Sequence, residues 1–128
     1  MRAAKDGARE AVFFDFDDAA PGPLAYDLAV FPWSRLLRGS SSTPDEGASI
    51  AWGRFLAGYA GVRDAPDADV GAVPTFVRLR HFLWLGELAS RSHHWGSETM
   101  PTAWLRRQAD LPDAWSTLEL PVGGLRGR

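Results

Sequence analysis

The 128-residue chain contains no cysteine, which excludes disulfide bonds and thiolate metal sites. No uninterrupted apolar stretch approaches the roughly 18 to 20 residues of a membrane span, and the N-terminal stretch MRAAKDGARE lacks the apolar region of a secretory signal. A net charge of -2 gives no general attraction to nucleic acid or anionic lipid. These absences predict a cytoplasmic protein with neither nucleic acid nor membrane as a partner.

The composition is that of a globular protein, with 45% hydrophobic and 23% charged residues. The length suits one compact domain, and the sequence shows neither an internal repeat nor a dividing linker. We therefore predict a single domain over residues 1–120. Residues 121–128, rich in Gly and Arg, are predicted to be a disordered tail.

Most of the chain has helical signals. Apolar residues recur at helical spacing from Leu24 to Leu37, with Pro32 predicted to kink that helix. A capping box of Thr43 and Glu46, with Pro44 at the first helical position, predicts the start of a second helix that ends near Gly61. Two further helices are predicted, over residues 73–89 after a loop at 64–69, and from Pro101 with an uncertain end because of Pro112. The nearly all-apolar third helix should be central.

The N-terminus has strand signals instead. Lys5, Asp6 and Gly7 form a turn signal, and the apolar run 11–16 that follows reads as a buried strand. The predicted fold class is mainly α with a short N-terminal β-hairpin. Asp15, Asp17 and Asp18 then lie at the C-terminal end of the strand, where carboxylates need a metal ion, a cation or backbone donors to offset their desolvation.

Two enzyme chemistries place aspartates at such a strand end. In phosphatases of the haloacid dehalogenase type the strand ends in Asp-x-Asp-x-Thr, but here Ala19 stands in place of the Thr, and the only lysine, Lys5, lies upstream of the motif. In phosphoryl transfer of the kinase type, an aspartate at a strand end holds Mg²⁺ against the phosphates of ATP. The sequence favours the second chemistry.

The stretch FFDFDDAAPGPLAYDLAVF resembles a segment of the aminoglycoside phosphotransferase and choline kinase-like family. The resemblance implies that Asp15 is the metal-binding aspartate and that Asp27 braces the backbone of the catalytic loop. Asp17 and Asp18 match positions that are often acidic, and they would act through the water shell of the metal. Without the resemblance, Asp15 reads as a strand-end carboxylate satisfied by backbone donors, and Asp27 as a helix-start residue favoured by the macrodipole.

The implied fold is the C-terminal helical part of a protein kinase-like catalytic lobe, and the implied activity is phosphorylation of a hydroxyl with Mg²⁺ and ATP as cofactors. The acidic doublet and the stretch PTFVRLRHFLWLGELASRSHHWG, residues 74–96, favour the branch that contains stress response kinase A and homoserine kinase-like proteins. The resemblance does not identify the acceptor, which in this family is a small molecule or a protein side chain.

The family's catalytic loop, His-Gly-Asp-x-His-x-x-Asn, precedes the metal aspartate, but none of it occurs among the fourteen residues before Asp15. Lys5 lies in the hairpin and so does not supply the nucleotide lysine. The chain therefore reads as a C-terminal fragment, inactive alone, with no catalytic residue of its own and an unknown nucleotide contact. Its expected partner is the missing N-terminal portion or a second copy. The alternative is a noncatalytic remnant or interaction module that keeps the helical scaffold.

Other polar and aromatic residues have weaker signals. His93 and His94 are adjacent, so they point to different sides of a helix and read as solvated, whereas His81 reads as a core or groove residue. Six tryptophans are present, and most of them read as core residues. One or two of Trp52, Trp84 and Trp95 are candidates for lining an acceptor cleft. Arginines that could meet an anionic substrate, or be solvated or paired, are Arg78, Arg80, Arg106 and Arg107.

Overall fold

The computed structural model of the chain describes residues 2–3, 9–10, 20–38, 44–96 and 99–121. The order of elements is β1 (Arg2–Ala3), β2 (Arg9–Glu10), α1 (Leu24–Arg38), α2 (Glu46–Ala60), α3 (Asp67–Ser90), α4 (Ser92–Trp95) and α5 (Thr102–Ala114). The prediction of a mainly helical fold is confirmed. The two short strands pair antiparallel, Arg2 opposite Glu10, but the predicted turn at residues 5–7 and strand at residues 11–16 lie outside the described residues.

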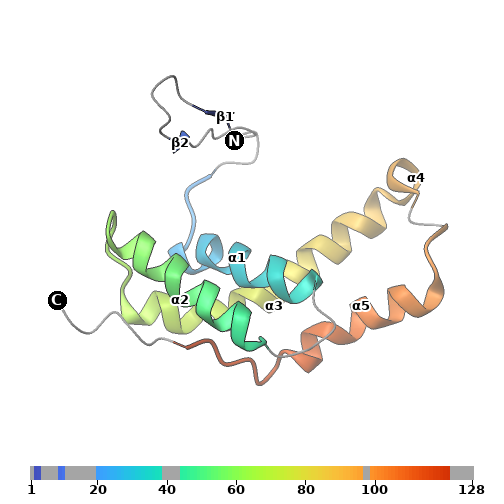
Figure 1. The fold of residues 1–128 in the computed structure, drawn as a ribbon. Coiled ribbons are helices and arrows are strands. Elements are labelled where there is room, and N and C mark those ends of the chain that lie inside the picture. The colour runs from blue at the N-terminus through green and yellow to red at the C-terminus, as the bar shows by residue number, and fades with distance from the viewer. Residues whose placement is uncertain (1, 4–8, 11–19, 39–43, 97–98, 122–128) are drawn as a thin grey trace.

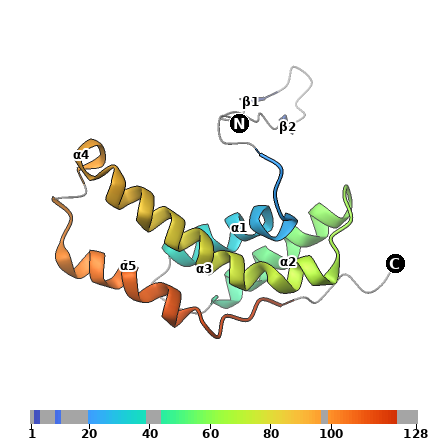
Figure 2. The ribbon, with the colours of Figure 1, turned by 180° about the vertical axis from the view of Figure 1, so that it is seen from behind.

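The helices are arranged around α3, the longest of them. Figures 1 and 2 show α1 lying along α3, with α2 beside α1 and α5 running back along the other side of α3 from the short α4. The predicted central place of α3 is thus confirmed for the side that faces α1 and α5. Other parts of its surface are open, because Leu79, Phe82 and Leu83 are 44%, 52% and 54% exposed.

The helix starts and ends follow local chemistry, with some differences from the prediction. α2 begins at Glu46 and its N-cap is Asp45, whose Oδ1 accepts a hydrogen bond from the Ala48 amide at 2.6 Å. The predicted start at Pro44 was therefore wrong, and Thr43 lies outside the described residues. An aspartate at the N-cap accepts a hydrogen bond from a free backbone amide, and its negative charge interacts favourably with the positive end of the helix dipole.

The third helix begins earlier than predicted, at Asp67, so only residues 64–66 remain of the predicted loop. Pro66 is its N-cap and provides no side-chain hydrogen bond. The negative charges of Asp67 and Asp69 in the first turn interact favourably with the positive end of the helix dipole. The four-residue α4 was not predicted. It ends at Gly96, which adopts a left-handed φ of 64° that glycine reaches without strain.

Two prolines lie inside helices without ending them. α1 continues through Pro32 to Arg38, and α5 continues through Pro112 to Ala114. Pro32 and Pro112 are both buried, so each ring adds apolar surface to the interior. The end of α5, which the sequence left open, therefore comes two residues after Pro112, and the chain then turns at Trp115.

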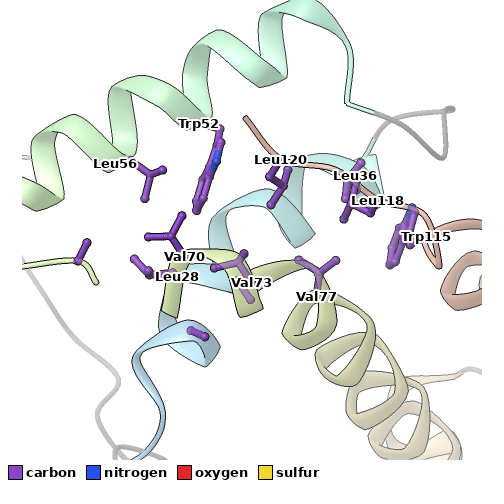
Figure 3. Packing of buried hydrophobic residues seen from close by; sticks show 13 residues of the cluster. Leu28, Leu36, Trp52, Leu56, Val70, Val73, Val77, Trp115, Leu118 and Leu120 are labelled. Atoms are coloured by element: carbon purple, nitrogen blue, oxygen red, sulfur yellow. The ribbon is translucent and has the colours of Figure 1, made fainter. Parts of the chain in front are cut away.

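The hydrophobic core lies where α1, α2 and the first half of α3 meet, and the segment after α5 closes it (Figure 3). Three aromatic rings line the α1–α2 contact: Phe31 stacks on Phe55 at 4.7 Å between centroids, and Trp52 lies 5.6 Å from Phe55. The buried residues of this cluster are Ala25, Leu28, Ala29, Leu36, Trp52, Leu56, Ala65, Val70, Val73, Val77, Trp115, Leu118 and Leu120.

No helix in the described part of the chain is both long and apolar enough to cross a membrane.

Candidate functional site

A pocket of about 420 Å³ lies between α1 and α3. Each helix contributes one stripe of side chains at helical spacing, and the stripes face each other because the helices lie side by side. The lining residues are Tyr26, Asp27, Val30 and Trp33 from α1, with Arg80, Leu83, Trp84 and Glu87 from α3. The pocket is the place where aromatic, acidic and basic side chains of the described residues come together.

Arg80 is the cation of this pocket. Its guanidinium carbon lies 5.4 Å from the ring centroid of Tyr26 and 5.2 Å from that of Trp33, so it makes cation–π contacts with two aromatic residues of α1. Each such contact stabilises by about 0.5 to 2 kcal/mol, depending on exposure. The Arg80 Nε is buried without a hydrogen-bond partner in the described part of the chain. The two rings thus fix the guanidinium in place without consuming that donor.

Trp33 connects the pocket to the interior. Its indole Nε1–H donates to Nδ1 of His81 at 3.3 Å, and its ring meets Trp84 edge-on with centroids 6.1 Å apart. His81 is fully buried, as the sequence suggested, and its Nε2 lies 2.8 Å from the Gln108 carbonyl oxygen on α5. Burial lowers the pKa of His81 below its ordinary value of 6.5, because the charged imidazolium loses its hydration, while the Gln108 carbonyl opposes this in part.

The two carboxylates of the pocket differ in their partners. Glu87 pairs with Arg91 one turn later at 3.3 Å, an exposed contact of little energetic weight. Asp27 is exposed in the first turn of α1, and within the described residues it makes no ion pair. Its carboxylate can therefore accept hydrogen bonds from outside this helix pair.

The remaining predicted site residues have mixed outcomes. Asp15, Asp17 and Asp18 lie outside the described residues, so the predicted metal site stays a prediction. Among the residues that the structure describes, no three His, Asp or Glu side chains gather as a metal site would require. Asp27 is the predicted site residue that the structure places, and it lines the pocket.

Of the three candidate cleft tryptophans, Trp84 lines the pocket, Trp52 is buried in the core, and the side chain of Trp95 lies outside the described part. His93 and His94 are exposed, as predicted.

The four candidate arginines fall into two groups. Arg80 lies in the pocket, whereas Arg78 donates from Nε to the Pro112 carbonyl at 2.9 Å and so fastens α3 to α5. Arg106 and Arg107 are exposed on α5 and take no part in the pocket. The sequence offered Arg80 only as one of four equivalent candidates. The stripe Tyr26, Val30 and Trp33 was a usable signal for the α1 wall, but nothing in the sequence set α1 against α3 in this register.

Comparison with known proteins finds one relative to report. A protein of Deinococcus radiodurans, described only as an uncharacterized protein, is 41% identical over 91 residues, which are 71% of this chain. The chain covers 26% of that protein, so it spans about a quarter of the relative's length. No family model matches the chain, and no solved structure does. The function must therefore be argued from the residues themselves.

Proposed function

We propose that the chain is the C-terminal helical part of a kinase-like ATP-dependent phosphotransferase domain, which phosphorylates a hydroxyl group on a small molecule or a protein. The observation that carries the proposal is the run from Asp15 through Asp17 and Asp18 to Tyr26-Asp27-Leu28-Ala29. Carboxylates after an apolar strand suit Mg²⁺, which prefers oxygen ligands and bridges the phosphates of ATP. In this proposal Asp15 is the metal ligand, and Asp17 and Asp18 support it through bound water.

The position of Asp27 supports the proposed bracing role. In the described structure its carboxylate is exposed at the pocket and is not neutralised by an ion pair, although Arg80 lines the same pocket. A carboxylate so placed can accept backbone N–H groups from a polypeptide segment that lies against α1. The catalytic loop of the whole enzyme would be such a segment.

Two exposed apolar side chains support a polypeptide neighbour at the pocket. Leu83, 54% exposed, lines the pocket from α3, and Val30, 38% exposed, lines it from α1. We propose that the remainder of the catalytic lobe covers this surface, and that a second copy of the chain covers it when the remainder is absent. Neighbouring exposed apolar side chains favour association more than scattered ones do.

The relative supports the proposal in one respect. Since the chain matches about a quarter of the Deinococcus radiodurans protein, the shared stretch is part of a much longer polypeptide there. A kinase-like domain needs such length for a nucleotide lobe and a catalytic loop. The competing function is a noncatalytic helical module, which is favoured by the lack of a His-Gly-Asp-x-His-x-x-Asn motif in this sequence.

A Mg²⁺ titration of the melting temperature separates the two functions. In the resembled family most metal ligands come from the nucleotide, from water and from the Asn of the His-Gly-Asp-x-His-x-x-Asn motif, which this sequence lacks. We therefore expect a dissociation constant for Mg²⁺ on the order of millimolar. Mg²⁺ at about five times that concentration should then stabilise the fold by about 1 kcal/mol, measured at constant ionic strength. Asp15→Asn keeps the shape and removes the charge, so it should abolish the response.

The matched control is Asp64→Asn, an exposed aspartate in the loop before α3, which should respond like the parent. If the parent and Asp15→Asn respond identically to Mg²⁺, Asp15 is not a metal ligand and the noncatalytic module is the better description. A charge effect unrelated to a site would lower the response of both variants equally.

A further inference from the structure

The hydrogen bonds of His81 fix its tautomer. The Gln108 carbonyl oxygen, 2.8 Å from Nε2, can only accept, so Nε2 bears the hydrogen. The indole Nε1–H of Trp33 can only donate, so Nδ1, 3.3 Å away, presents its lone pair. Both ring nitrogens are thus used by the neutral imidazole, one toward α1 and one toward α5. A single buried side chain on α3 therefore joins the two helices that pack on either side of it.

Protonation would break this arrangement. A second hydrogen, on Nδ1, would point at the indole N–H of Trp33, so the bond would be lost and two donors would oppose each other. The charged groups on the neighbouring contacts are cations: Arg80 lies over Trp33, and Arg78 donates to the Pro112 carbonyl on α5. From α1 the ring meets Trp33, and from α5 and the turn after it the ring meets Gln108 and Trp115, none of which titrates.

The aromatic rings around His81 do not compensate for a charge. Trp84 and Trp115 lie 5.3 Å and 5.0 Å from its centroid, and indole rings attract cations. That attraction is smaller than the cost of burying an imidazolium that no carboxylate contacts within the described residues. The lowered pKa of His81 agrees with this comparison, in which the cost of burying the charge exceeds the attraction of the rings.

We propose that His81 is an acid-sensitive latch, which in its neutral form holds α1 and α5 on α3 and keeps Trp33 in the wall of the pocket. Because Trp33 also supports the Arg80 guanidinium, opening the latch disturbs the pocket and the α5 contact together. The latch follows from contacts within the helices alone, and it does not depend on the proposed phosphotransferase activity.

The direction of the pH effect follows from proton binding. The unfolded chain takes up a proton at His81 near pH 6.5, whereas the folded chain does so only at lower pH. The contribution of His81 to stability is therefore complete above about pH 6.5 and is lost as the pH falls toward the lowered pKa of the folded state. At pH 5.5 the folding equilibrium constant should be lower by up to about tenfold from this one group.

Imidazole ¹⁵N chemical shifts of the whole chain, recorded from pH 8 to pH 5, test the tautomer and the pKa of His81. We expect the Nε2–H neutral form of His81 to persist below the ordinary imidazole pKa of 6.5. Trp33→Phe keeps an aromatic ring and removes the donor, so it should raise the pKa of His81. An Nδ1–H tautomer, a His81 pKa at or above 6.5, or no change in the His81 pKa in Trp33→Phe would overturn the latch.

Urea unfolding at pH 7.5 and pH 5.5 gives a second measurement. The parent should lose stability at the lower pH, His81→Gln should lose less because it has no proton to gain, and His94→Gln should follow the parent. Equal pH dependence of the parent and His81→Gln would overturn the proposal. If His81→Gln does not fold, the ¹⁵N titration of the parent and of Trp33→Phe decides alone.

Discussion

The packing of α1 on α3 predicts a large loss of stability when Leu28 is shortened. Leu28 is 1% exposed and belongs to the core cluster shared by three helices and the segment after α5. Leu28→Ala removes the transfer free energy of the lost carbons and leaves a cavity that its neighbours fill only in part, so it should cost about 2 to 5 kcal/mol. That is a large part of the roughly 5 to 15 kcal/mol that holds a domain folded.

Leu83→Ala is the matched control for this prediction. The residue type and the helical setting are the same, so the change in helix propensity is equal, but Leu83 is 54% exposed in the pocket wall. Its loss should cost less than about 1 kcal/mol, since about half of its surface is already in water. Urea unfolding followed by tryptophan fluorescence and far-UV circular dichroism gives both free energies. Two variants within about 1 kcal/mol of each other would refute the assigned packing of α1.

Three further outcomes are expected. Asp45→Ala should lower the free energy of unfolding by about 1 kcal/mol through loss of the α2 cap, whereas Asp64→Ala in the next loop should change it little, and equal urea midpoints would contradict the cap. With ATP and Mg²⁺ the isolated chain should phosphorylate no acceptor, because the catalytic units of phosphoryl transfer act together; acceptor-dependent ADP release that Asp15→Ala abolishes would show otherwise. Self-association measured by sedimentation should weaken in Leu83→Gln and not in Val62→Gln, because Val62 is 92% exposed and does not line the pocket. A strict monomer at all concentrations would contradict an associating surface between α1 and α3.

The sequence predicted the helices well, because apolar periodicity and the capping, glycine and proline residues at helix ends are local properties. α1 and α2 were placed within three residues at each end, and the nearly all-apolar third segment became the central helix. The wrong predictions concerned the starts of α2 and α3 and one very short helix. Thr43, Pro44 and Asp45 all favour a helix start, and only the backbone geometry decides that Asp45 is the cap. A single-turn helix such as α4 is too short to show a period.

The candidate site was less predictable, because it depends on how two helices meet. Asp27 was named from a motif, and Trp84 was one of three tryptophans offered. Arg80 gave no special signal, since an arginine on a helix flank is ordinarily solvated. Its environment comes from residues 47 and 54 positions earlier, and such long-range pairing depends on core packing between α1 and α3.

Trp33 shows why the pocket and the core cannot be altered independently. One side chain forms a wall of the pocket, supports the Arg80 guanidinium, meets Trp84 edge-on and donates to buried His81. A ligand or polypeptide that moves the indole must also stretch the bond to His81, and through His81 it acts on the α5 carbonyl of Gln108. Such a coupling would be reciprocal. The change that a bound ligand makes in the free energy of α5 attachment would equal the change that α5 attachment makes in the free energy of ligand binding. A ligand of the α1–α3 pocket that moved Trp33 would therefore also act on the attachment of α5, through His81.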